Sequence, residues 1–393
     1  MRKDLLFKIG IVVVLLAGVL VFIPGLLPFR TNKEIVAEWC VIFFIAILFK
    51  NRWAGLFILW VLINQILSTY TPVVGLNKAY ILGLHLVVIY AFFYSLFVQY
   101  VNKNNLNLVF DIIGCMAIFQ VLMMLFQYNG LWIGILPLQY QSMEVVAKLK
   151  LHELFYIYQF KDIAGNNIPG FMDMVNTASG LLAVSLPVFF RKKWYWGIPF
   201  IFAGLWMSRS LGGLVPAVLI SFIYLVVKHR KYAFLFITPL LIFSVLFFLK
   251  YEKLSTLLTG TGRLEVWKAG ILIWCKKPLI GWGFNQCNYL WRISITLMNE
   301  PMKFLHYHNE YLNTLMELGF IGLWIIIGYF ADLFLKIKKS FSDEKILILC
   351  LAIIAGLINA IVNFTMHTII GLVLIIYFAC IDKMGEENAI HSL

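Results

Sequence analysis

The feature that most constrains this chain is a recurrence of apolar runs bounded by charged residues or by Pro and Gly. A run of about 20 apolar residues crosses the hydrocarbon core of a bilayer as one α-helix. Such runs cover residues 6–23, 34–49, 53–69, 79–101, 107–127, 171–190, 194–208, 211–227, 232–249, 318–335, 345–363 and 367–381. The sequence therefore predicts an all-α polytopic membrane protein with about 12 transmembrane helices.

Composition excludes a soluble protein, because 62% of the residues are hydrophobic and only 13% are charged. Soluble domains carry about 25% charged residues, which they need to cover their surface. No internal repeat is evident in the sequence, so we expect one membrane domain over residues 1–393. Two long segments, 128–170 and 250–317, separate groups of spans and are predicted to be large loops.

The distribution of Lys and Arg predicts the orientation. With the N-terminus in the cytoplasm, most cations outside the long loops fall in cytoplasmic segments; the short outer loops hold only Arg30, Lys33, Lys78 and Arg209. Cytoplasmic loops of membrane proteins carry this excess. We expect both termini inside and both large loops outside. The net charge of +13 then reflects topology and contact with the lipid bilayer, and nucleic acid is not an expected partner.

The cysteines suggest no metal site, because no Cys/His spacing matches a zinc motif. Four of the six cysteines fall inside predicted spans. Cys275 and Cys287 both lie in the second long loop, where an oxidising compartment would allow a disulfide. No other feature of the sequence requires that bond.

Polar residues not needed for solubility gather in three places, the first being residues 261–285. We predict a helix over 263–275, on which Arg263 and Trp267 share a face because they are four residues apart. A Pro and two Gly follow it and favour a tight turn. The alternative is an amphipathic helix at the headgroups, with Arg263 on lipid phosphate and Trp267 in the aromatic belt.

The second polar stretch, 306–322, leads into an apolar span. At 100° per residue, Glu310, Asn313 and Glu317 share one helical face. His308 is expected at the N-terminus of this helix, where the helix dipole disfavours imidazolium; a neutral imidazole suits a general base. The alternative is a set of interfacial groups that cap the helix.

The third place is the turn Met207–Gly213, where Arg209 lies between two spans. An arginine at this depth is costly unless it meets an anion or a water-filled cavity, or reaches lipid phosphate by snorkelling. All three places fall on the outer side, so two arginines and one histidine can converge there. Guanidinium groups bind phosphate oxygens in pairs, which suits a polyprenyl diphosphate-linked substrate at the bilayer edge.

Together these motifs resemble the O-antigen ligase and polymerase superfamily. The resemblance rests on Arg263…Trp267…Pro278…Gly281-x-Gly283-x-Asn285 and on His308-Asn309-x-x-Leu312…Glu317-x-Gly319-x-x-Gly322. Ser208-Arg209 is similar to the family's Ser-Arg-Gly turn, although Ser210 stands where the family has glycine. The run from Asn176 to Pro187 is similar to the helix that precedes that turn. The motifs cover residues 165–325.

The resemblance implies a bacterial inner-membrane glycosyltransferase that works on the periplasmic face, without metal or other cofactor, and inverts the anomeric centre. The donor would be a glycan on undecaprenyl diphosphate. A ligase would transfer it to a lipid A-core sugar, and a polymerase to another lipid-linked glycan. Arg209, Arg263 and His308 are the expected catalytic residues. The expected substrate-binding residues are Asn176, Trp267, Asn285, Asn309, Tyr311, Glu317, Asn363 and His367.

Two of these residues come from spacing alone. Asn359, Asn363 and His367 recur every four residues and form one polar stripe if a helix continues through them. Such a stripe either lines the substrate cavity or forms interhelical hydrogen bonds.

Two other classes of protein remain as alternatives. About twelve spans with both termini inside also suit a secondary transporter, but no two-fold repeat is evident and the polar groups lie on one side instead of at the midplane. A scaffold protein would leave the Arg and His cluster unexplained.

Overall fold

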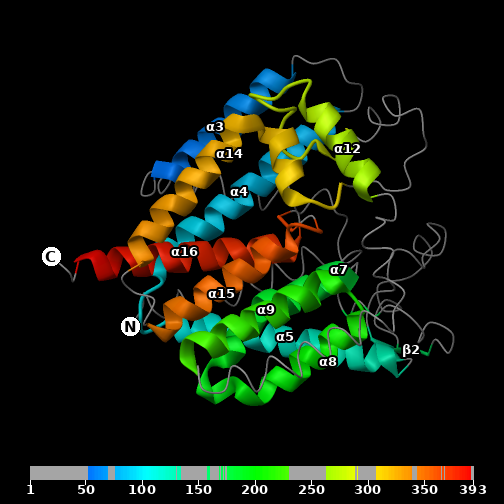
Figure 1. Cartoon of the computed structure of the whole chain (residues 1–393), viewed down its shortest axis with the longest axis vertical. Coiled ribbons are helices and arrows are strands. Elements are labelled where there is room, and N and C mark those ends of the chain that lie inside the picture. The colour runs from blue at the N-terminus through cyan, green and yellow to red at the C-terminus, as the bar shows by residue number, and fades with distance from the viewer. Residues whose placement is uncertain are drawn as a thin grey trace.

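The computed structural model describes most of the second half of the chain and part of the first (Figure 1). The described residues are 52–69, 76–129, 131–133, 157–159, 168, 170, 172, 175–229, 263–287, 290, 307–338, 343–363, 365–366 and 368–390.

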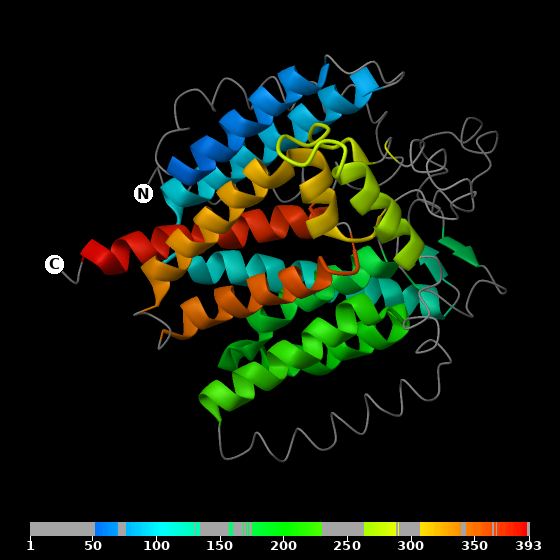
Figure 2. The same ribbon diagram turned by 45° about the horizontal axis from the view of Figure 1, so that its top comes forward.

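The described part is a bundle of helices (Figures 1 and 2). The α-helices are α3 Arg52–Thr69, α4 Leu76–Tyr100, α5 Leu106–Tyr128, α7 Val175–Ser185, α8 Ile198–Ser208, α9 Leu211–Lys228, α12 Arg263–Trp274, α14 Glu310–Ile337, α15 Glu344–Asn359 and α16 Ile369–Ile390. Two 3-10 turns, η3 Leu186–Phe190 and η4 Lys192–Gly197, connect α7 to α8. Pro187 and Pro199 stand within the first two residues of η3 and α8, where a missing N–H costs little.

Nine of the twelve predicted spans overlap helices of the structure. These helices are α3, α4, α5, α7 with η3, α8, α9, α14, α15 and α16. The runs 6–23, 34–49 and 232–249 lie outside the described residues. Among the described residues, α5, α9 and α14 are long and apolar enough to cross a membrane by length and composition. The count of about 12 spans stays a prediction.

One departure from the all-α prediction is a short antiparallel pair in the first long loop. Strand β1 (Leu131–Ile133) pairs with β2 (Ile157–Gln159), with Leu131 opposite Gln159. Hydropathy cannot show strands this short, because three residues carry no readable period. Residues 134–156, between the two strands, lie outside the described residues.

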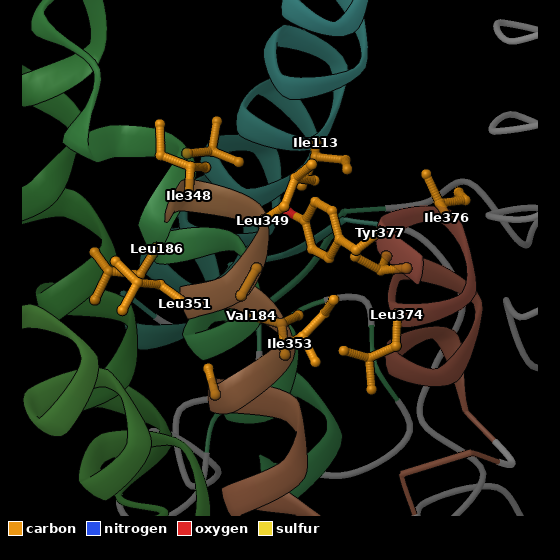
Figure 3. Packing of buried hydrophobic residues seen from close by; sticks show 14 of the residues in the cluster. Ile113, Val184, Leu186, Ile348, Leu349, Leu351, Ile353, Leu374, Ile376 and Tyr377 are labelled. Atoms are coloured by element: carbon orange, nitrogen blue, oxygen red, sulfur yellow. The ribbon is translucent and has the colours of Figure 1, made fainter. Parts of the chain in front are cut away.

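The core lies where α7, α15 and α16 meet α5, as the close view of buried side chains shows (Figure 3). Val184, Ile348 and Ile376 are fully buried there. The outside of the bundle is apolar too: Trp324 is 72% exposed and Phe334 57% exposed on α14. Side chains of this kind on an outer surface fit lipid rather than water as the surrounding solvent.

The bundle has a basic end, where α3, α5 and α15 begin and α9 and α14 finish (left in Figures 1 and 2). Arg191 pairs with Asp111 at 2.7 Å, and Lys336 pairs with Asp382 at 2.6 Å. Lys345 Nζ donates to the carbonyl of Lys103 at 2.7 Å. These groups belong to segments predicted to be cytoplasmic. The three polar motifs belong to the opposite end, called the site end below.

Candidate active site at the site end of the bundle

The α8–α9 turn presents Arg209 in a left-handed backbone conformation, with φ 51° and ψ 23°. This conformation costs a non-glycine residue roughly 1–2 kcal/mol. Three hydroxyl contacts hold the turn. Ser208 Oγ donates to the Leu205 carbonyl at 2.7 Å and accepts from the Ser210 N–H at 3.3 Å. Ser210 Oγ donates to Asn176 Oδ1 at 2.7 Å.

These contacts explain the residue that departs from the family pattern. Ser210 takes the place of a glycine, and its hydroxyl anchors the turn to Asn176 at the start of α7. Close packing of α9 against α7 also holds the turn in place, because a Cβ on Gly213 would overlap the backbone of Ser179. Asn176 therefore acts on the Arg209 turn through Ser210.

Arg263 begins α12 and is half-buried, yet among the described residues it makes no hydrogen bond or ion pair. Burial lowers the pKa of its guanidinium group from the ordinary value. A half-buried cation without a counter-ion is unfavourable unless a ligand supplies the negative charge. Its position at a helix N-terminus would favour the same anion.

Trp267 lies one turn after Arg263, and its indole group binds the protein backbone. Its indole N–H donates to the carbonyl of Tyr307 at 2.8 Å, directly before His308. Helix α12 packs closely here, since a Cβ on Gly270 would lie 2.6 Å from Leu312 and 3.0 Å from the Tyr307 ring. Arg263 and His308 are therefore on neighbouring parts of one packed unit.

His308 has φ 48°, so it too occupies the left-handed region. Asn309 follows it as the N-cap of α14 and accepts from the Leu312 N–H at 2.9 Å. This confirms the prediction that His308-Asn309 lies at the N-terminus of a helix. Tyr311 is 41% exposed, and its hydroxyl donates to the Leu357 carbonyl at 2.8 Å.

The predicted polar face of α14 is confirmed by burial. Glu310, Asn313 and Glu317 are 8%, 3% and 2% exposed. Glu317 Oε1 accepts from the Cys287 N–H at 3.0 Å, so its carboxylate is occupied by the backbone of the preceding loop. Glu310 was not predicted to be a site residue. Its Oε2 accepts from the Met366 N–H at 3.2 Å.

Helix α14 breaks at Gly319, which has φ 64° and ψ −168°; the bend is visible in Figure 1. The loop after α12 fills the break with backbone hydrogen bonds in both directions. Trp282 and Gly283 donate to the carbonyls of Met316 and Glu317 at 2.8 and 2.9 Å. Phe320 donates to the carbonyl of Pro278 at 2.9 Å.

The glycines of the two motifs make this exchange possible. A Cβ on Gly281 would overlap the Glu317 carbonyl, and a Cβ on Gly319 would overlap the Leu279 carbonyl. The Pro-Gly-Gly motif (residues 278–283) and the Glu-x-Gly motif (residues 317–319) therefore pack backbone against backbone and form one structural unit, called the joint below. Asn285 follows this joint with φ 63°. Trp60 and Asn64 of α3 brace it from outside by donating to the carbonyls of Leu318 and Ile280.

Cys275 and Cys287 are both free thiols. The structure thus contradicts the disulfide that the sequence allowed. Cys275 is exposed, while Cys287 is 4% exposed and its thiol lies 3.7 Å from the Asn313 carbonyl. Burial, with Glu317 nearby, raises the pKa of Cys287 well above its ordinary value. One thiol faces outward and the other fills the core beside α14.

The predicted stripe of Asn359, Asn363 and His367 does not form, because α15 ends at Asn359 and a turn follows. Asn359 Nδ2 instead donates to the Gly212 carbonyl at 2.7 Å, beside the Arg209 turn. Asn363 is buried against the same place, since a Cβ on Gly212 would lie 2.6 Å from its Nδ2. His367 lies outside the described residues.

Backbone strain singles out the same motifs. Among the described residues, Arg209, Asn285 and His308 are the non-glycine residues with positive φ. Strained conformations of this kind persist where the surroundings fix them, and they cluster at functional sites. Hydrogen bonds and packing join Trp267, His308 and Glu317 into one unit, and Asn176 with Arg209 into another.

In chemical terms, the site end offers two guanidinium groups for an anion, Arg209 and Arg263, and one imidazole, His308. Among the described residues, no group of three or more His, Cys, Asp and Glu could hold a metal ion. Glu310 and Ser210 are the contributors that sequence reasoning missed. Glu310 shares a helical face with Glu317, so the helical period could have identified Glu310 as a candidate site residue.

In a comparison with known families, the family model described as O-antigen ligase matches residues 179–327. The matched segment contains the Arg209 turn, α12 and the start of α14. A search of curated proteins found no match.

Proposed function

Because the family model described as O-antigen ligase matches residues 179–327, we propose that this chain is a member of the O-antigen ligase and polymerase superfamily and that it transfers a glycan from undecaprenyl diphosphate to a lipid A-core sugar. The reaction takes place on the periplasmic face of the bacterial inner membrane. The acceptor hydroxyl attacks the anomeric carbon, the bond to the diphosphate breaks, and the configuration inverts.

The observation that carries the proposal is the half-buried Arg263, which makes no hydrogen bond or ion pair with the described residues. Diphosphate is an anion of matching chemistry, and hydrogen bonds to charged groups contribute about 1.5–3 kcal/mol each. Arg263 and Arg209 bind the diphosphate and stabilise the negative charge that grows as it leaves. Diphosphate is already a competent leaving group, so no general acid is required.

His308 orients and deprotonates the acceptor hydroxyl. Its position directly before the N-terminus of α14 favours the neutral imidazole, which can accept that proton. Its backbone is fixed from both sides, by Trp267 on Tyr307 and by Asn309 as the helix cap. A fixed base needs little reorganisation when the substrate arrives.

The other predicted substrate-binding residues divide into two groups. The side chains of Asn176, Glu317, Trp267 and Asn309 already bind protein atoms, so we assign them to holding the Arg209 turn and the His308 corner. The Tyr311 hydroxyl likewise binds the Leu357 carbonyl. The amide nitrogen of Asn363, which has no hydrogen-bond partner among the described residues, is better placed to meet a sugar hydroxyl. Asn285 and His367 remain proposed contacts.

Deletion of the gene, followed by gel analysis of surface polysaccharide, tests the proposal. We expect loss of all polymer linked to lipid A, with lipid-linked chains accumulating. If single repeats remain on the core, the chain is a polymerase of the same superfamily. In proteoliposomes, solute uptake without glycan transfer would overturn the enzyme and leave a transporter.

A further inference from the structure

An unbroken chain of contacts links the Arg209 turn to the His308 corner. It begins at the Gly212 carbonyl, three residues after Arg209, which accepts from Asn359 Nδ2 at 2.7 Å. Asn359 Oδ1 accepts from Thr365 Oγ1 at 3.2 Å. The next residue, Met366, donates its N–H to Glu310 Oε2 at 3.2 Å, two residues after His308. Side chains of α14, of α15 and of the connection between α15 and α16 thus link the two motifs.

The residues that make this series of hydrogen bonds are buried. Asn359 is 0%, Thr365 1% and Glu310 8% exposed. A buried polar group that loses its partner cannot replace it with water, so these linked hydrogen bonds strongly favour one geometry. The packing around Asn359 is also close, because a Cβ on Gly180 of α7 would lie 3.0 Å from Asn359 Nδ2.

Both backbone polar groups of Met366, its N–H and its carbonyl, are held by hydrogen bonds. Its N–H reaches Glu310, while its carbonyl accepts from the Tyr90 hydroxyl of α4. In the opposite direction, the Glu310 N–H donates to the Ala360 carbonyl at 2.9 Å. The connection between α15 and α16 is therefore clamped against the start of α14 at two points.

We propose that Asn359, Thr365 and Glu310 are positioning residues that set the separation between the diphosphate-binding arginine and the acceptor-activating histidine. The inference rests on the proposed function, since it assigns Arg209 to the donor and His308 to the acceptor. In this role Glu310 acts through its hydrogen bond to the Met366 N–H and is assigned no proton-transfer step.

Alignment of this kind controls turnover more than binding. A displacement of about 1 Å between reacting groups can lower a rate by about 10²-fold, while each substrate still binds its own half of the site. The signature of a positioning residue is therefore a fall in kcat with little change in KM or in diphosphate affinity.

Thr365 offers a matched pair of substitutions for the test. Thr365→Val keeps the shape and removes the hydroxyl donor, whereas Thr365→Ser keeps the donor. The full-length protein in proteoliposomes is assayed with undecaprenyl diphosphate-linked glycan, and affinity is measured with undecaprenyl diphosphate alone. We expect Thr365→Val to lower kcat by about tenfold with KM and diphosphate affinity within about twofold, and Thr365→Ser to restore kcat.

Thr177→Val is the control, since Thr177 is also buried and its hydroxyl has no hydrogen-bond partner among the described residues. We expect it to match wild type. If Thr365→Val and Thr365→Ser both match wild type, the inference is wrong while the proposed function stands. If wild type itself transfers no glycan, the proposed function fails instead.

Glu310 keeps the inference testable if Thr365→Val does not fold. Glu310→Gln retains an oxygen that accepts from Met366, and Glu310→Ala does not. We expect Glu310→Gln to keep most of kcat with an unchanged pH profile, and Glu310→Ala to lose about tenfold. An inactive Glu310→Gln variant that folds normally would show that the carboxylate exchanges a proton, which contradicts a positioning role.

Discussion

The two ends of the bundle use charge in opposite ways. At the basic end, Arg191 is paired with Asp111, and Lys336 with Asp332 and Asp382. Every ion pair found among the described residues lies at this end. At the site end, the half-buried Arg263 makes no such pair with described residues.

The difference separates charges that stabilise the protein from charges that await a ligand. A buried pair leaves little for a ligand to gain, and removal of one member leaves the other charge buried and uncompensated. A half-buried cation without a counter-ion has the reverse property: its removal costs the protein little and the ligand much. Substitutions at the two ends should therefore affect different measured quantities.

The largest expected effect is on turnover, from His308→Ala. Removal of a general base lowers a rate by about 10²–10⁴-fold. We expect glycan transfer to fall by that factor while the melting temperature and the affinity for undecaprenyl diphosphate stay near those of wild type. Tyr311→Phe is the neighbouring control and should keep substantial activity. Full transfer by His308→Ala would remove this histidine from the mechanism.

Arg263→Ala is expected to have the next largest effect. Loss of one donor that stabilises developing negative charge lowers kcat by about 10²–10³-fold. Arg263→Lys keeps the charge but loses the paired geometry of guanidinium, so it should fall between Ala and wild type. Stability should not drop, because no described partner is left behind.

Lys268→Ala on the exposed face of the same helix provides the control for charge alone. If Arg263→Lys equals wild type, paired binding of phosphate oxygens does not matter. If Lys268→Ala reduces transfer as strongly as Arg263→Ala, the general positive potential of α12 is responsible instead.

The comparison also shows what the sequence could predict. Local patterns succeeded: the helix expected over 263–275 is α12, and the face shared by Glu310, Asn313 and Glu317 is buried. Both results depend on the helical period, which a few neighbouring residues determine.

Non-local contacts explain the failures. Gly319 lies in an unbroken apolar run, and the break there exists because residues 278–283 donate to and accept from it. The Asn359 stripe failed because the helix ends where Asn359 turns to Gly212 of α9. Neither partner is near in sequence, so spacing alone could not reveal either contact.

Lys336→Met removes the ion pairs of Lys336 with Asp332 and Asp382 at the basic end, and we expect it to lower stability without affecting catalysis. Asp382, which is 1% exposed, would lose its cation at 2.6 Å, while the Tyr94 hydroxyl would still donate to its carboxylate. An unpaired buried charge costs about 3 kcal/mol, so we expect a lower melting temperature and less folded protein. Transfer per folded molecule should stay within about twofold of wild type.

The exposed Lys338 serves as the matched control, and Lys338→Met should change neither stability nor transfer. A Lys336→Met variant that is fully stable but inactive would contradict the division between the two ends.

The smallest expected effect comes from chemical labelling of Cys275, which tests which end faces outward. Its exposed thiol lies at the site end, while Cys287 is buried and its raised pKa slows reaction further. In spheroplasts, a membrane-impermeant maleimide should label wild type, should not label Cys275→Ser, and should leave transfer unchanged. A cysteine placed at exposed Lys228 of the basic end, in a Cys275→Ser background, should react only after the membrane is opened. The opposite labelling pattern would put the arginines and His308 in the cytoplasm, where a periplasmic glycan transfer could not occur.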